Sequence, residues 1–149
     1  MTTRHLRRLP GLTVDDWRAL CEALVLLVLV AGILRVSSFK RALAWIQRVG
    51  TTPIRSAAVV SDGAVPEAQR LARRLEFVAD HLPLKPRCLV RALAGHALML
   101  RRRIPSELVI GTERAVSTLR AHAWLGVDGR VVIGQAEADR YAPIWNHAS

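Results

Sequence analysis

Residues 86–104 read Pro-Arg-Cys-Leu-Val-Arg-Ala-Leu-Ala-Gly-His-Ala-Leu-Met-Leu-Arg-Arg-Arg-Ile, and this stretch decides the fold. Its apolar residues recur along one stripe at helical spacing: Leu89, Leu93, Ala97, Leu100 and Ile104. The spacing predicts a helix that begins near Cys88 and continues to about Arg103. Because a proline cannot extend a preceding helix, Pro86 brings the chain in with free backbone N–H groups at the helix N-terminus. Cys88 is therefore expected in the first helical turn.

Cys88 is a candidate nucleophile because of this position. The positive end of the helix dipole favours a thiolate, and Arg87 and Arg91 add positive charge around it. The same N–H groups could hold an oxyanion formed during acyl transfer. The alternative is that Cys88 is one more buried apolar residue.

Short β-type runs follow the helix, at 107–111, 119–127 and 130–133. Asp128-Gly129, a dipeptide favoured in two-residue type I′ hairpins, separates the last two runs. Strand alternation puts His122 on the polar face of the second run, together with Trp124. A cysteine at a helix start and a histidine on a later strand form the arrangement of papain-like and transglutaminase-like thiol enzymes. In such enzymes the histidine takes the thiol proton and later protonates the leaving amine.

The other histidines fit this role less well. His96 lies eight residues along the same helix as Cys88, about 12 Å away at 1.5 Å per residue, so it is expected to be a core or surface residue. No motif surrounds His5, His81 or His147.

A third residue should orient His122. Asp128 shares its strand parity but lies about 20 Å away along the strand. If Asp128 and Gly129 are the central turn residues, His122 faces Gln135 across the hairpin. Gln135 is therefore the tentative orienter through its amide oxygen, with a solvated glutamine at a strand end as the alternative.

Composition limits the class of protein. The chain has 149 residues, of which 51% are hydrophobic and 23% charged, and this predicts one domain with an apolar core. Two cysteines, Cys21 and Cys88, without a C-x-x-C pair indicate neither a disulfide framework nor a zinc site, so no metal or cofactor is expected. The net charge of +10 suggests an anionic partner, but the arginines are dispersed. No nucleic acid is expected, and a basic nucleic-acid- or partner-binding module is kept as an alternative.

The N-terminal region predicts two helices, from the N-cap Thr13 to Ile33 and from Ser38 to Val49. The uncharged run at 23–34 is shorter than the roughly 20 residues that span a bilayer, so the protein is expected to be cytoplasmic. The buried stripe expected on the first helix makes Cys21 a small structural hydrophobe: Trp17, Leu20, Cys21, Leu24, Leu27 and Val28. A helix apolar nearly all round is central to a core or pressed against a partner or membrane surface, and both interpretations stay open.

These elements predict an α+β fold, with helices packed on a small antiparallel sheet. Residues 1–50 are expected to form a helical extension packed on the core, and 51–64 a loop. Residues 65–149 are expected to form the thiol-enzyme core, which begins with a helix over 65–80.

Four segments together resemble the transglutaminase-like leader peptidases of lasso-peptide biosynthesis: Cys88-Leu-Val-Arg-Ala-Leu, Arg101-Arg-Arg-Ile-Pro, Leu108-Val-Ile-Gly and His122-Ala-Trp-Leu-Gly-Val-Asp-Gly. The resemblance covers about residue 65 to the end and extends to the Leu/Arg-rich helical region before it. Members of this family are bacterial cysteine proteases of secondary metabolism that remove the leader from a ribosomally made precursor peptide. A separate ATP-dependent lasso cyclase then closes a macrolactam ring on the freed α-amine. The resemblance implies that Cys88 is the nucleophile and His122 the base.

The sequence departs from this family at two positions. The acidic third residue usually lies about a dozen residues after the histidine, where this chain has Gly134 and Gln135, and Glu137 or Asp139 could compensate. Gly126 stands where the family commonly has glutamate. These departures leave weak activity or a pseudoenzyme open.

The resemblance also implies partners. The peptidase and its extension account for the whole chain, so the leader is expected to be presented by a separate recognition protein that docks on the basic surface or the N-terminal helices. A transglutaminase-like acyltransferase is the remaining alternative.

Overall fold

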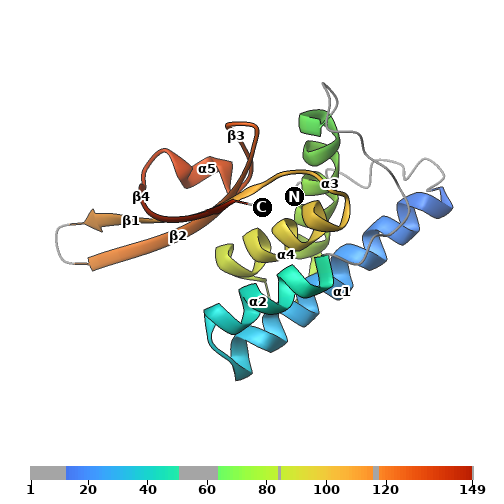
Figure 1. Ribbon diagram of the computed structural model, residues 1–149, viewed down its shortest axis with the longest axis horizontal. Helices are drawn as coiled ribbons and strands as arrows, with labels where there is room; N and C mark the ends of the chain where they lie inside the picture. The colour runs from blue at the N-terminus through green and yellow to red at the C-terminus, as the bar shows by residue number, and fades with distance from the viewer. Residues whose placement is uncertain (1–12, 51–63, 84, 116–117, 149) are drawn as a thin grey trace, which may run out of the picture.

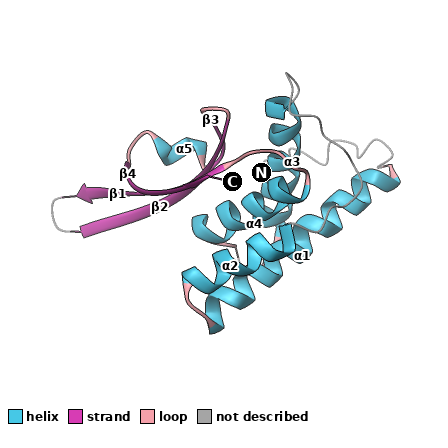
Figure 2. Ribbon diagram, in the orientation of Figure 1, coloured by secondary structure: helices cyan, strands magenta, loops and turns pink. Residues whose placement is uncertain are grey.

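The computed structural model describes residues 13–50, 64–83, 85–115 and 118–148. The elements in chain order are α1 (Val14–Val36), α2 (Phe39–Gly50), α3 (Ala64–His81), α4 (Cys88–Arg101), β1 (Glu107–Ala115), β2 (Thr118–Val127), β3 (Arg130–Ile133), α5 (Gln135–Ala138) and β4 (Ala142–Ala148). Figure 2 shows the four long helices gathered on one side and the strands on the other. The predicted α+β class is confirmed.

The strands form one antiparallel sheet in the order β3-β2-β1-β4. Asp128 and Gly129 have φ angles of 50° and 70°, so the predicted type I′ turn joins β2 to β3. The expected register holds for Val127↔Arg130 and Gly126↔Val131, and then shifts so that Leu125 pairs with Ile133. The sequence did not predict β4, which pairs with β1 and forms one edge of the sheet.

The centre of the fold is α4, which lies between the other long helices and the sheet (Figure 1). Every residue from Ala92 to Met99 is buried. Gly95 lets the helix approach β2 and β3 closely, because a Cβ there would collide with the buried side chain of Ile133. The predicted N-terminal extension shares this core, since Leu27, Val30 and Ile46 belong to the same apolar cluster.

Ion pairs also fix the extension to the later helices. Glu22 of α1 accepts hydrogen bonds from Arg101 and Arg102 at the end of α4, at 2.8 Å and 2.6 Å. Asp16 pairs with Arg74 of α3. Asp16 thus has two roles. It holds α1 to α3 through Arg74, and its side chain completes a capping box with the predicted N-cap Thr13.

The buried stripe expected on α1 is wrong. Of the residues expected on it Leu27 is buried, but the rest of the inward face is made of residues outside that stripe: Ala19, Ala23, Leu26 and Val30. Cys21 is exposed, and Trp17 and Val28 are 58% and 56% exposed. The physical reason is that α1 is apolar on both faces, so periodicity alone could not select the one that packs.

The expectation that this segment is too short to span a membrane considered only the uncharged run at 23–34. The helix itself, Val14–Val36, is long and apolar enough to cross a membrane by length and composition, with a mean hydropathy of 2.4 over its best 18-residue window. Only 28% of that window is buried inside the structure. One face of α1 packs on the domain while the other is apolar and exposed.

Candidate active site

Cys88 is the first residue of α4 and is partly exposed. The preceding Arg87 is the N-cap, with extended backbone angles and no hydrogen bond from its side chain to the helix. No capping side chain from Arg87 therefore covers the N–H groups of the helical turn that begins at Cys88. The placement expected from the sequence is confirmed, and the thiol has the local setting of a nucleophile at a helix N-terminus.

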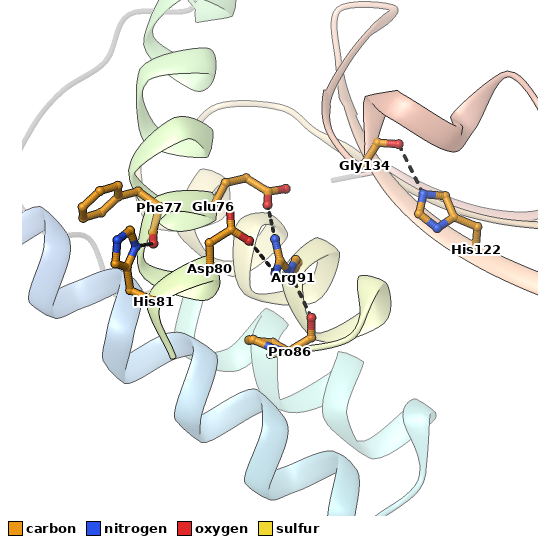
Figure 3. Close-up of polar contacts among 8 residues, drawn as sticks. All are labelled: Glu76, Phe77, Asp80, His81, Pro86, Arg91, His122 and Gly134. Atoms are coloured by element: carbon orange, nitrogen blue, oxygen red, sulfur yellow. Dashed lines mark hydrogen bonds and ion pairs between the residues drawn. The ribbon is translucent and has the colours of Figure 1, made fainter. Parts of the chain in front are cut away.

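Arg91 does not supply free positive charge beside the thiol. Its guanidinium pairs with Glu76 and Asp80 of α3 and donates from Nε to the carbonyl of Pro86 at 3.0 Å (Figure 3). Burial alone would lower the pKa of Arg91, but the hydrogen bonds and charges of the two carboxylates outweigh it and raise that pKa above its ordinary value. Arg91 instead fixes the chain just before Cys88 to the end of α3.

His122 lies on β2 and is 9% exposed. Its Nε2 lies 3.2 Å from the carbonyl oxygen of Gly134 (Figure 3), and because a carbonyl can only accept, Nε2 is the donor. In the neutral ring Nδ1 then carries the lone pair that can take a proton. Trp124 stacks near the ring at a centroid distance of 6.1 Å, and Tyr141 lies at 5.1 Å. The sequence did not single out Tyr141, since no periodic pattern surrounds it.

The two predicted catalytic residues lie on packed elements, because α4 packs on β2. Strand alternation turns Ala123 and Leu125 into the core shared with α4, while His122 and Trp124 belong to the other face. Among the described contacts, no hydrogen bond joins the Cys88 thiol to the His122 ring. Cys88 thus begins the helix that packs on one face of the sheet, while strand alternation places His122 on the opposite face, and the pairing of the two residues stays a prediction.

The structure places the predicted third residues as follows. Gln135 opens the short helix α5 and is exposed, so the cross-strand position expected for it is wrong. The shift in register after Gly126 removes that pairing. Asp128, in the turn, and Asp139 are exposed, and the side chain of Glu137 lies outside the described residues.

Gly134 occupies the orienting place beside His122. Its φ is +80°, and a Cβ there would lie 3.1 Å from Nε2 of His122 and 3.1 Å from the carbonyl oxygen of Ala123. Only a glycine brings its backbone this close to the ring without strain. Sequence reasoning missed this contact because it comes from the main chain.

An open groove of about 490 Å³ lies on the same face of the sheet as His122 and Trp124. Its lining is mostly apolar and aromatic: Glu107, Val109, Trp124, Pro143, Ile144, Trp145 and Asn146. Asn146 donates to Glu107 at 2.8 Å, so the polar groups of the groove already bind each other. The groove can hold apolar side chains of an extended ligand beside His122.

His96 is fully buried, which agrees with the prediction that it is not catalytic. Its Nδ1 lies 2.9 Å from the hydroxyl of Ser106, and the ring contacts His147 edge to face. Burial lowers the pKa of His96 to about 4, and the charge of His147 adds a smaller effect. Within the described part of the chain, no three His, Cys, Asp or Glu side chains gather as a metal site.

In a comparison with protein families, the sequence of the chain matches the transglutaminase-like superfamily over residues 27–146, which is most of its length. The match begins within α1 and ends within β4, so it includes both Cys88 and His122. No curated protein and no solved structure matches the chain.

Proposed function

The chain belongs to the transglutaminase-like superfamily, whose members are typically cysteine-type enzymes, and from this premise we propose that it is a leader peptidase. It cleaves the leader from a lasso-peptide precursor and frees the core α-amine for macrolactam formation. The observation that carries the proposal is Cys88, partly exposed at the first residue of α4. The His122-Ala-Trp strand supplies the base that this chemistry needs.

The proposed reaction has two steps. The Cys88 thiol gives its proton to His122, and its sulfur attacks the scissile carbonyl; the carbon–nitrogen bond then breaks as His122 protonates the leaving amine. The leader remains as a thioester on Cys88. Water then adds to this thioester, its proton returns through His122 to the sulfur, and the leader leaves with a free carboxylate. Backbone N–H groups at the start of α4 are suited to hold the oxyanion in both steps.

Gly134 takes the orienting role in this mechanism. Its carbonyl accepts from Nε2, which leaves Nδ1 as the atom that exchanges a proton with the thiol. A backbone carbonyl fixes the tautomer and direction of the ring as a carboxylate would, but it adds no full negative charge. The proposed pair is therefore Cys88 and His122, with Gly134 as a positioning residue.

A peptide substrate fits the surroundings of His122 better than a nucleic acid does. The adjacent groove is lined mostly by apolar and aromatic side chains, which suit the side chains of a peptide. Within the described ranges, six arginines are already in ion pairs with carboxylates: Arg18, Arg74, Arg91, Arg101, Arg102 and Arg140. These pairs intersperse carboxylates among the arginines, so they leave the net charge at +10 but argue against the continuous basic strip that a nucleic-acid site needs.

The proposal includes partners and a compartment. The precursor peptide is the substrate, a separate leader-recognition protein presents it, and an ATP-dependent lasso cyclase consumes the freed amine. The enzyme acts in the cytoplasm, where ribosomal precursors are made. If the purified chain cleaves the full precursor at an undiminished rate without any other protein, the recognition partner is excluded.

The chain offers a matched control for the nucleophile, because both of its cysteines are at least partly exposed. Cys88→Ala, incubated with precursor and recognition protein, should lose cleavage entirely by mass spectrometry. Cys21→Ala removes the other thiol and should cleave at the normal rate. Cleavage that survives Cys88→Ala would refute the mechanism.

The same thioester could be attacked by an amine instead of water, as in an acyltransferase of this superfamily. Mass spectrometry separates the outcomes, because hydrolysis of a peptide bond adds one water across two fragments. Acyl transfer from a glutamine side chain instead releases ammonia and leaves a crosslinked product. A crosslinked product would replace the peptidase proposal with the acyltransferase.

A further inference from the structure

The face of α1 that points away from the domain is apolar along its whole length. Between Arg18 and Arg35 the exposed residues are Cys21, Leu24, Val25, Val28, Leu29 and Gly32, and we call this set the outward face. From Cys21 to Gly32 it extends for about 17 Å at 1.5 Å per residue. No side chain on it carries a charge, hydroxyl or amide. Monomeric proteins rarely expose so continuous an apolar surface without a use for it.

The outward face is not the side of α1 that packs on the rest of the domain. The opposite side of α1 is the one that packs on α3 and α4, through residues such as Ala23, Leu27 and Val30. Figure 1 shows α4 lying between α1 and the sheet, so the outward face points away from the sheet. A ligand on the outward face would leave the groove beside His122 accessible.

We propose that the outward face docks on an anionic lipid surface, with α1 lying in the plane of the interface. A lipid surface demands no hydrogen bonds from the protein, whereas protein interfaces carry about one per 100–200 Å². The domain covers the other side of α1, so the exposed aliphatic stripe, with an arginine at each end, is the surface of this helix that can lie at an interface. Trp17, which is 58% exposed at one end of the stripe, has the ring type enriched at the headgroup level.

Charge favours an anionic membrane over a second copy of the chain. The protein has a net charge of +10, so two copies repel each other, while anionic headgroups attract each basic residue near the surface. Exposed Arg35, Lys40 and Arg41 lie at one end of the outward face. At the other end Arg18 is exposed, with Asp15 beside it.

The helix lies on the membrane rather than across it. Spanning would require the whole circumference of α1 to face lipid, and its inner face is buried in the domain core together with α3 and α4. Glu22, at the border of the outward face, is paired with Arg101 and Arg102 and would have to leave these partners in the bilayer. Peripheral docking needs neither change.

The test is sedimentation of the full chain with vesicles of phosphatidylcholine alone or of an equimolar mixture with phosphatidylglycerol. The chain should sediment with the mixed vesicles, and far less with the neutral ones. Val25→Glu combined with Val28→Glu should lower the partition coefficient by at least about tenfold, from the burial of valine side chains. Ile144→Glu places one such charge on the sheet, at a residue that is 64% exposed, and should sediment like the parent chain, whereas Val25→Glu alone should sediment less.

Three results would overturn the proposal. The first is no sedimentation with the mixed vesicles, and the second is unchanged sedimentation of the double variant. The third is a dimer by light scattering without lipid that the double variant abolishes, since this would assign the face to a second copy. Circular dichroism and alkylation of Cys88 confirm that each variant is folded. The result does not depend on the proposed peptidase activity.

Discussion

Replacing Gly134 by alanine tests whether its carbonyl orients His122. The new Cβ would lie 3.1 Å from Nε2 and 3.1 Å from the Cβ of Trp124, so the ring has to shift by a few tenths of an ångström, and its hydrogen bond to the Gly134 carbonyl should weaken. The φ of +80° adds backbone strain of about 1–2 kcal/mol for any residue with a Cβ.

Gly129→Ala provides the matched control for this strain. Its φ is +70°, but nothing lies within 4 Å of the added Cβ. Both variants therefore carry similar backbone strain, and only Gly134→Ala disturbs His122. The difference between them isolates the contact with the ring.

The size of that difference follows from the hydrogen bond. When His122 becomes an imidazolium, the bond from Nε2 has a charged donor, and such bonds are worth about 1.5–3 kcal/mol. Its loss should lower the population of the thiolate–imidazolium pair by roughly tenfold to hundredfold at neutral pH. Alkylation of Cys88 at neutral pH should slow by a comparable factor.

The assay is alkylation by iodoacetamide across a range of pH, with Cys88 and Cys21 separated by peptide mass spectrometry. Cys88 should react more slowly at neutral pH in Gly134→Ala, while Gly129→Ala should match the parent chain. Cys21 provides an internal reference in every sample. Equal Cys88 rates in the two glycine variants would refute the reasoning, and a loss in Gln135→Ala as large as in Gly134→Ala would assign orientation to the glutamine.

Two further predictions concern stability. Because burial lowers the pKa of His96 to about 4, the unfolded chain binds a proton between pH 6.5 and 4 that the folded chain does not. The free energy of unfolding therefore has no pH dependence from His96 above pH 6.5 and falls by up to about 3 kcal/mol as the pH drops from 6.5 through 4. In His96→Gln, the free energy of unfolding measured with urea should fall less between neutral pH and pH 4 than in the parent chain. The same pH dependence in both proteins would contradict the assignment to His96. Gly95→Ala should lower the free energy of unfolding by about 1 kcal/mol, because overpacking against Ile133 exceeds the gain in helix propensity. Gly32→Ala, where nothing lies within 4 Å of the added Cβ, should raise the free energy of unfolding by about 0.5–1 kcal/mol. If Gly95→Ala and Gly32→Ala both raise or both lower the free energy of unfolding, the close packing at Gly95 is refuted.

Local signals explain which elements were predictable. Pro86 and the periodic apolar residues after it specify the start of α4, and Asp128-Gly129 specifies the β2–β3 turn. β4 lacks such a signal because most of its residues are exposed and its pairing with β1 is distant in sequence. The chain between β3 and β4 forms the short helix α5. The sequence does not predict it, because it has only four residues and no N-terminal capping pattern.

The packing face of α1 required the structure for a different reason. A helix with aliphatic residues on both sides has little amphipathic signal, so the buried set beginning at Ala19 and the exposed set beginning at Trp17 look alike in sequence. Ion pairs decide between them. Asp16 and Glu22 must reach Arg74 and Arg101, and this fixes the rotation of the helix.

The third residue of the site shows how a main-chain group can replace a side chain. Judged by side chains alone, glycine at position 134 in place of the family's acidic third residue indicates an enzyme with weakened activity. The carbonyl of Gly134 nevertheless holds Nε2 of His122, and the glycine's positive φ and lack of a Cβ permit this contact. Restoring the acid by Gly134→Asp would place a Cβ against the ring, so it should impair the site rather than improve it. A carbonyl supplies direction without charge, so in the proposed mechanism the activation of Cys88 would rely more on the N-terminus of α4 than it would beside a carboxylate.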